Sequence, residues 1–197
     1  MQLANSYLRK NEMPKVITII TCVVLLSASA GYGLTFDQVD VEYWTGTGSN
    51  SAMLVVDYGQ DSFLFGYSWD GEATGWDMIS QIADGGPLDI TSVSWRGAYT
   101  IEGISYSYND VLYEAEPDWG NYYWGYWNSV DGLQWDPSNV GMSARQLQDG
   151  DWDGWSIEEA VVSYIPLNPP QVPEPTTMLL LAAGSMVLLR QGKRRFA

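Results

Sequence analysis

The chain has 197 residues, a formal net charge of −15 at pH 7, one cysteine and no histidine. This length suits one compact domain with processing segments at its ends. Without histidine, every catalytic triad that needs an imidazole is excluded, and the lone cysteine, Cys22, offers neither a disulfide nor a zinc site. Between residues 31 and 175 the only basic side chains are Arg96 and Arg145. A surface this acidic repels nucleic acid, so a nucleic-acid partner is excluded.

Residues 1–30 have the features of a secretory signal peptide. Lys15 precedes an apolar run, VITIITCVVLL, from Val16 to Leu26, and small residues follow as far as Gly31. A positive charge, a short apolar core and an A-x-A-like site, in this order, are typical of an export signal. As a helix the run is about 16 Å long, too short to span a hydrocarbon layer of about 30 Å. The sequence therefore predicts export through the inner membrane, with an N-terminal signal helix that is removed.

A proline-rich linker, residues 167–176, leads to a second apolar stretch, Met178 to Leu189. A basic cluster follows this stretch: Arg190, Lys193, Arg194 and Arg195. A stiff linker, an apolar helix and positive charges that stay on the cytoplasmic side predict a C-terminal membrane helix with a basic tail, residues 177–197. The apolar helix is about 18 Å long, so it requires a thin membrane or arginines that reach back to the interface.

This C-terminal segment resembles the PEP-C-terminal (PEP-CTERM) sorting signal of certain Gram-negative bacteria. The residues that match the signal are Val172, Pro173, Glu174, Pro175, Arg190, Arg194 and Arg195. In proteins with this signal an exosortase, a membrane protease, recognises the tail and removes it near the Pro-Glu-Pro. The resemblance implies an exosortase as partner and a transient anchor in the inner membrane. It also implies a final place at the cell surface or in the extracellular matrix.

The middle of the chain, residues 31–166, is expected to form a small exported α+β domain that is acidic, aromatic and rich in β-strands. Residues 52–58 and 62–67, joined by a short turn with a glycine, predict a β-hairpin. Thr74 and Asp77 form a capping box that opens the one clear helix, and Gly-Gly-Pro at 85–87 ends it. Further strands are predicted at 39–44, 90–95, 99–108, 122–127 and 155–157.

Short motifs in this middle part resemble the β-grasp domain related to the C-terminal domain of transcobalamin. The motifs are Tyr123-Trp124-Gly125-Tyr126, Val140-Gly141, Leu147 to Asp151 and Trp155. The resemblance implies a mixed sheet with one main helix, built from residues 52–157. Some members of that wider family bind corrinoids, and many have no known ligand. The excursion from Asn128 to Ser138 departs from the pattern, and no ligand-contact motif matches, so the resemblance assigns no binding residues.

The predicted strand at 122–127 carries aromatic side chains on both of its faces, which leaves two interpretations open. An aromatic core can cover both faces, or one face can be exposed and stack on a flat ligand, either a carbohydrate or a corrinoid-like cofactor. The ligand-binding candidates under the second interpretation are Trp124, Tyr126, Trp127 and Trp135.

The segment Asp149-Gly150-Asp151-Trp152-Asp153-Gly154 resembles the first half of a calcium loop. Asp149, Asp151 and Asp153 occupy the first, third and fifth ligand positions of an EF-hand, but Ala160 stands where a bidentate glutamate is required. The alternative is an acidic turn that enters the last strand. We adopt the turn, which predicts no required metal, and keep an extracellular type of calcium site as the alternative.

The sequence offers no catalytic motif that its acidic composition does not explain. Glu114, Glu116 and Asp118 cluster near Trp119, as in a carboxylate-based glycosidase, but a solvated acidic loop gives the same pattern. No G-x-S-x-G, phosphate-binding loop or zinc motif is present. The sequence therefore predicts a non-enzyme. The exported domain is either a ligand-binding module or a structural component of the cell surface or exopolysaccharide matrix with no discrete ligand.

Overall fold

The structure is a computed structural model that describes residues 33–115, 122–159 and 167–173. From Leu34 onward these residues belong to one compact unit. No helix among them is both long enough and apolar enough to cross a membrane. The predicted signal helix, the predicted membrane helix and the sorting residues from Glu174 onward lie outside the described residues, as do Glu116, Asp118 and Trp119.

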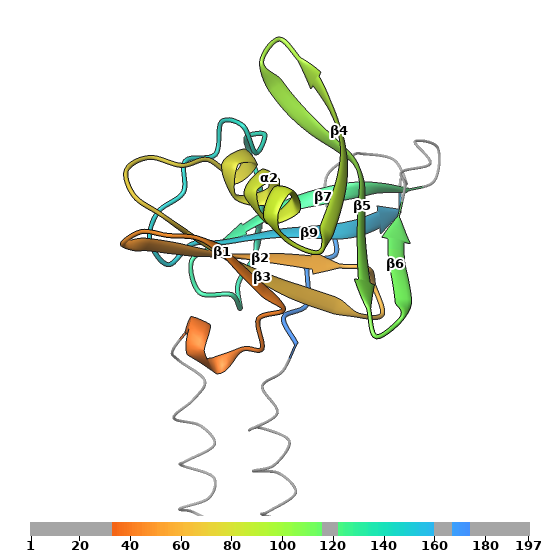
Figure 1. Cartoon of the computed structure of the whole chain (residues 1–197). Helices are drawn as coiled ribbons and strands as arrows, with labels where there is room; N and C mark the ends of the chain where they lie inside the picture. Colours follow the sequence, from red (N-terminus) through yellow and green to blue (C-terminus); the bar gives the residue numbers. More distant parts are fainter. Residues whose placement is uncertain (1–32, 116–121, 160–166, 174–197) are drawn as a thin grey trace, which may run out of the picture. The chain divides into compact units, whose positions relative to one another are not determined.

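A six-stranded mixed sheet forms the framework of the domain, which is small and rich in β-strands, as the sequence predicted (Figure 1). The resemblance to the transcobalamin-related β-grasp domain stays a prediction. The strands of the sheet in spatial order are β1 (Tyr43–Gly46), β3 (Ser62–Trp69), β2 (Asn50–Asp57), β9 (Trp152–Glu159), β7 (Tyr122–Ser129) and β8 (Asp136–Pro137). Strand β1 runs parallel to β3, and β2 runs parallel to β9, whereas the other neighbours are antiparallel. The last strand of the described residues, β9, thus lies in the middle of the sheet.

The predicted hairpin is confirmed as β2 and β3, which pair along their whole length from Asn50↔Trp69 to Asp57↔Ser62. In the turn, the Tyr58 amide donates to the Asp61 carbonyl at 3.0 Å. Gly59 adopts a φ of +90°, a conformation that favours glycine because it has no Cβ.

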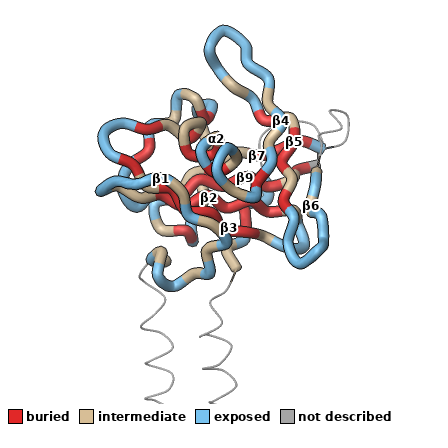
Figure 2. Tube along the Cα trace, in the orientation of Figure 1, coloured by how far each residue is buried: buried red, intermediate tan, exposed pale blue. Residues whose placement is uncertain are grey.

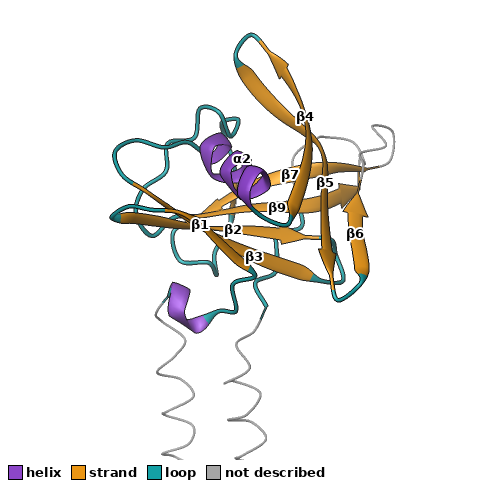
Figure 3. Cartoon of the chain, viewed as in Figure 1, coloured by secondary structure: helices purple, strands orange, loops and turns teal. Residues whose placement is uncertain are grey.

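The predicted helix is also confirmed, as α2 (Gly75–Gly85). The Thr74 side chain accepts from the Asp77 amide, and the Asp77 side chain accepts from the Thr74 amide, so both halves of the capping box are present. Met78, Ile79 and Ile82 are spaced to share one face of the helix, and all three are fully buried. Figure 3 shows this helix lying across the strands.

Two further predicted strands exist but belong to a separate sheet. β4 (Leu88–Trp95) and β5 (Ala98–Tyr108) form an antiparallel pair, and a third strand that sequence did not predict, β6 (Val111–Ala115), completes a three-stranded sheet. Two-residue turns close both hairpins, and each places non-glycine residues at positive φ: Arg96 at 53°, Asn109 at 51° and Asp110 at 63°.

The strand predicted at 39–44 is shorter than expected. A 3₁₀ helix, η1 (Phe36–Gln38), precedes it, and β1 begins only at Tyr43. Val39 and Val41 alternate with acidic residues but precede β1. Both valines pack against the face of the sheet opposite α2, so their alternation comes from this packing and not from a strand. At the other end, β9 is longer than the strand predicted at 155–157.

Both faces of the central strands are covered, and Figure 2 shows most of β2, β3 and β9 in red. Alternate residues of β2 point to opposite faces. Ala52, Leu54 and Val56 join the larger core beneath α2, which we call the helix-side core. Met53 and Val55 join Leu64 and Trp152 in a smaller cluster on the other face, which we call the second core.

Candidate functional site

The acidic turn before β9 ties the last strand to the beginning of β2. The Asp149 side chain accepts from the Ser51 amide at 2.9 Å, and the Gly150 amide donates to the Ser51 carbonyl at 2.8 Å. Gly150 has a φ of +89°. The first aspartate of the candidate calcium loop therefore caps the neighbouring strand.

The other two aspartates of the loop bind one arginine. Arg145 donates from Nη2 to Asp151 Oδ2 at 2.7 Å and from Nε to Asp153 Oδ1 at 3.3 Å. Both carboxylates are buried, with Asp153 at 1% exposure. A buried charge requires a partner, and here one guanidinium serves two carboxylates. We call Arg145, Asp151, Asp153 and their neighbours Tyr126 and Asn128 the buried polar cluster.

Asp153 is the centre of this cluster. It accepts from the Tyr126 hydroxyl and, at 3.1 Å, from Asn128 Nδ2, in addition to Arg145. Burial raises the pKa of Asp153 to about 6, although all three donors stabilise its charged form. Burial and the charge of Asp153 likewise raise the pKa of Tyr126 far above its ordinary value, so the hydroxyl stays protonated and donates.

The cluster is closed by the first residue of α2. A Cβ at Gly75 would lie 2.5 Å from Tyr126 Oη and 2.8 Å from Asp153 Oδ2, closer than real Cβ contacts. Only glycine lets the helix start this near the two side chains. The cluster therefore joins α2, β7 and β9 with its donors and acceptors bonded to one another, as a structural joint rather than an open site.

The described residues include no group of three or more acidic, histidine or cysteine side chains that could hold a metal ion. Asp149 bonds to Ser51, and Asp151 and Asp153 bond to Arg145. This arrangement fits the acidic turn that the sequence favoured. The calcium alternative stays a prediction, and a calcium titration tests it.

The four aromatic ligand candidates do not form one face. Trp124 and Trp127 are buried, whereas Tyr126 and Trp135 are half-buried. Trp124 and Tyr126 pack in the helix-side core, and Trp135 packs against the second core. Trp127 alternates with Tyr126 along β7, so its side chain points away from that of Tyr126.

Several of these rings are also bonded within the domain. Trp124 Nε1 donates to the Ala115 carbonyl at 3.1 Å, and Trp127 Nε1 donates to Ser156 Oγ at 2.8 Å. Tyr126 stacks on Trp155, with ring centroids 4.6 Å apart. A ligand role for these residues stays a prediction. In the structure, these residues pack on the two faces of one sheet.

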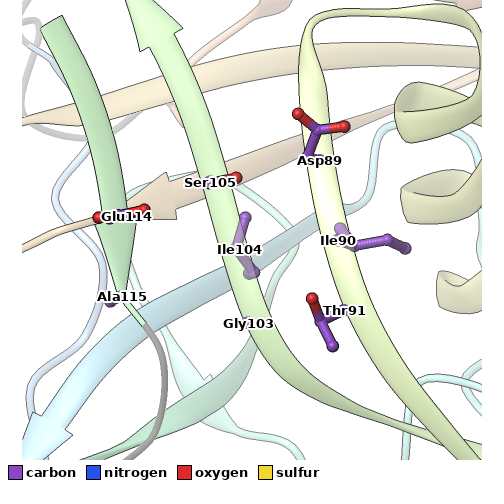
Figure 4. Close-up of a pocket in the computed structure, with 8 residues that line it drawn as sticks. All are labelled: Asp89, Ile90, Thr91, Gly103, Ile104, Ser105, Glu114 and Ala115. Carbon is purple, nitrogen blue, oxygen red and sulfur yellow. The ribbon is translucent and has the colours of Figure 1, made fainter.

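Glu114 lies in a row of polar residues across the three-stranded sheet. Asp89 pairs with Ser105, and Ser105 pairs with Glu114, so the three side chains share one face (Figure 4). Asp89 and Glu114 are exposed and line a shallow pocket. Exposed carboxylates in water interact weakly, so this row provides no general acid or base with a matched environment.

The linker before the sorting signal is held by two buried carboxylates that sequence reasoning missed. Glu158 is 2% exposed and accepts from the Asn168 amide at 2.9 Å and from Asn168 Nδ2 at 2.7 Å. Asp57 is 7% exposed and accepts from the Gln171 amide at 2.8 Å. An acidic residue at an inward-facing position of an apolar strand was the feature of the sequence that could have predicted these buried acceptors.

The same linker packs on the second core. Val172, the first residue of the predicted sorting motif, contacts this core together with Leu34 and Phe36 from the start of the described chain. A Cβ at Gly154 would lie 2.4 Å from the Pro170 ring, so the linker lies directly on β9. The segment Leu167–Pro173, which we call the linker strap, is thus part of the fold.

The tail beyond the linker strap places this chain in the class of exported proteins that carry a C-terminal signal for sorting at the membrane. A family model described as the PEP-CTERM protein-sorting motif matches residues 171–195, which confirms the resemblance seen in the sequence. The chain therefore carries a PEP-CTERM sorting signal and is an exported substrate of exosortase-dependent sorting. No curated protein and no solved structure matches the chain.

Proposed function

We propose that this protein is a non-catalytic structural component of the cell surface or exopolysaccharide matrix, delivered there by exosortase-dependent sorting. One observation carries the proposal: the side chains that the sequence offered to a ligand or a metal pack in the core or bond to other groups of the domain. Trp124 and Trp127 lie in covered faces of the sheet, and Asp151 and Asp153 share Arg145. The exposed side chains include many solvated carboxylates.

The strand order supports a β-grasp-like framework for this domain. The hairpin β2–β3 is followed by α2, and the last strand, β9, lies beside β2 and parallel to it, with β7 on its other side. Such a framework holds β2 and β9 side by side in the middle of a covered sheet. We propose that it serves as a stable, soluble body that carries the acidic surface.

A deletion strain and two complementing chains test the proposed function. We expect loss of the gene to weaken matrix cohesion, measured by the shear stress that disperses the cells. The wild-type chain should restore cohesion and appear in the matrix fraction. A chain with alanine at Pro173, Glu174 and Pro175 should remain with the membrane fraction and fail to restore it. Cohesion that is unchanged in the deletion strain overturns the proposal.

Ligand binding is the second candidate, favoured by the solvent that still reaches Tyr126 and Trp135. A carbohydrate or corrinoid-like ligand that stacks on either ring should change tryptophan fluorescence in a saturable way. We expect no saturable change on titrating the purified chain with the organism's exopolysaccharide or with cobalamin. A saturable change that is lost in Trp135→Ala replaces the structural role with the binding role.

A further inference from the structure

The hairpin between β4 and β5 extends beyond the body of the domain and ends in an exposed apolar and cationic group (Figures 1 and 2). Trp95 is 71% exposed and Val93 is 46% exposed. Arg96 occupies the turn, and its guanidinium carbon lies 4.4 Å from the centroid of the Trp95 ring. We call Val93, Trp95 and Arg96 the hairpin tip.

Arg96 is the one cation that the described residues leave unpaired with a carboxylate. The other basic residue in this part of the chain, Arg145, is paired with Asp151 and Asp153. Trp95 and Arg96 thus place an exposed indole ring beside a guanidinium that has no carboxylate partner, on an acidic domain. Tryptophan and arginine are enriched in interface hot spots. The charge of Arg96 selects an acidic partner.

A hollow at the other end of the same sheet has the complementary chemistry. It has a volume of about 260 Å³ and is lined by Tyr58, Gln60, Asp61, Leu112, Tyr113 and Glu114. The Tyr58 and Tyr113 rings lie 5.7 Å apart, and Leu112 is 56% exposed, which makes an apolar wall. Asp61 and Glu114 add two exposed carboxylates. A cavity of about 150 Å³ already holds benzene, so this hollow has room for an indole ring.

The hairpin tip cannot reach the hollow of its own chain. Tyr113 in the hollow pairs with Tyr106 of β5, whereas the tip adjoins Ala98 at the other end of that strand. Eight residues of extended strand separate Ala98 from Tyr106, which is about 26 Å at 3.3 Å per residue. Figure 1 shows the β4–β5 turn and the β5–β6 turn at opposite ends of the sheet. Any tip that fills a hollow therefore comes from another copy.

We propose that the hairpin tip of one copy docks in the hollow of the next, with Trp95 against Leu112 and Tyr113 and with Arg96 facing Asp61 and Glu114. The contact is heterologous, because two different surfaces meet, and so it continues into an open chain of copies rather than closing as a dimer. The patch is small, so a single contact is weak. Tethering many copies in one envelope supplies the high local concentration that a weak contact needs.

This inference rests on the proposed function, since an open chain of exported domains is what a structural matrix component requires. Trp95 supplies the large contact area, and Arg96 supplies the selectivity for an acidic partner. The same Trp95 could stack on a saccharide instead, and the experiment below separates the two occupants.

Disulfide trapping of full-length chains in the native envelope tests the docking. In a Cys22→Ser background, one tagged chain carries Ala98→Cys beside the tip, and a second, differently tagged chain carries Gln60→Cys on the rim of the hollow. Both positions are exposed, and all six proposed contact residues stay intact. We expect a mixed dimer between the two tags under mild oxidation and a ladder when one chain carries both cysteines. Glu72→Cys, an exposed site away from the hollow, is the matched control for Gln60→Cys.

Three variants sharpen the test. Trp95→Ala should lower the trapped fraction about tenfold or more, as expected for a hot-spot residue. Arg96→Glu should lower it similarly. Combining Arg96→Glu with Glu114→Arg in the same chain should restore part of it, because one of the two charge pairs is then reversed rather than removed. Trapping no greater than with Glu72→Cys overturns the docking, and so does a failure of the reversed pair to recover any of it.

Failure of the docking and failure of the proposed function give different results. No trapping together with a deletion strain that loses cohesion overturns the docking alone. Trapping together with unchanged cohesion supports the docking and overturns the matrix role. If trapping is absent but Trp95→Ala releases the chain from purified exopolysaccharide in a pull-down, the tip binds saccharide and the docking is wrong.

Discussion

The strands at the centre of the six-stranded sheet bury their tryptophans, whereas the far end of the three-stranded sheet exposes one. In the six-stranded sheet, Trp127 and Trp152 are at most 4% exposed, whereas Trp95 at the end of β4 is 71% exposed. The continuous apolar runs of β2 and β3 are typical of strands buried on both faces, but the alternation along β4 and β5 does not show which of their residues are exposed. What differs is the cover: α2 lies on one face of the larger sheet, and the N-terminal segment and the linker strap lie on the other.

The smaller sheet is covered only over part of its length. Leu88, Ile101, Ile104 and Tyr106 join the helix-side core, and Ile90 and Tyr99 pack against it. However, β4 continues past Ile90 to Val93 and Trp95, which pack against neither core. A side chain on that extension has no partner layer, so it stays in water whatever its hydrophobicity. The burial of a side chain therefore depends on whether another layer of structure covers its part of the strand. The periodicity of the strand does not show how far that layer extends.

The largest effect should come from removing a ring of the second core. Trp152 is 1% exposed and packs against Phe36, with ring centroids 5.3 Å apart. Trp152→Ala should lower the free energy of unfolding of the full-length chain by about 3–5 kcal/mol, because a large cavity remains. Urea denaturation measures the loss, and Trp152→Phe should recover part of it. A loss below about 1 kcal/mol would show that this face of the sheet is not a packed core.

The buried polar cluster should make stability depend on pH. The pKa of Asp153 is raised to about 6, above the value near 4 that it has in an unfolded chain. The native state therefore holds the extra proton between about pH 4 and 6, and the contribution of this group to stability falls as the pH rises through that window. Two pKa units correspond to about 3 kcal/mol at most.

A variant isolates that contribution from the other acidic residues. Asp153→Asn keeps the shape of the side chain and cannot titrate. Urea denaturation at several pH values measures the free energy of unfolding of the wild type and of this variant. From pH 4 to 7 the wild type should lose stability relative to the variant. A difference that is constant with pH, or that moves toward the wild type, contradicts a raised pKa for Asp153.

The linker strap should be released by removing its acceptor. Glu158→Ala leaves the Asn168 amide without its partner, at a cost of about 2 kcal/mol in the free energy of unfolding. We also expect faster cleavage of residues 167–173 by an added protease, measured by mass spectrometry. Glu72→Ala, at an exposed position, is the control and should change the stability by less than about 0.5 kcal/mol. Equal cleavage in the two variants would mean that Glu158 does not hold the strap.

Local signals in the sequence were sufficient for the helix and the hairpin, because a capping box and a glycine turn act over a few residues. The tail was recognised for a similar reason, since the sorting motif is a short contiguous pattern. The partners of Arg145 were not predictable, because Asp153 meets Tyr126 and Gly75 only after three elements have packed together. The linker strap escaped prediction because Gln171 in the strap and its partner Asp57 are distant in the chain.

The smallest effect on stability should come from the most exposed tryptophan, which completes the comparison of the two sheets. Trp95 packs on no core residue and contacts only Arg96 among the ring interactions of the described chain, so Trp95→Ala should change the free energy of unfolding by less than about 0.5 kcal/mol. Parallel urea curves for Trp95→Ala and Trp152→Ala measure both ends of the scale. If the two losses are similar, the hairpin tip is buried in solution and the contrast between the sheets fails. If only Trp152→Ala lowers the free energy of unfolding, the exposed Trp95 side chain does not stabilise the fold. Its apolar area is then available for contacts outside the domain.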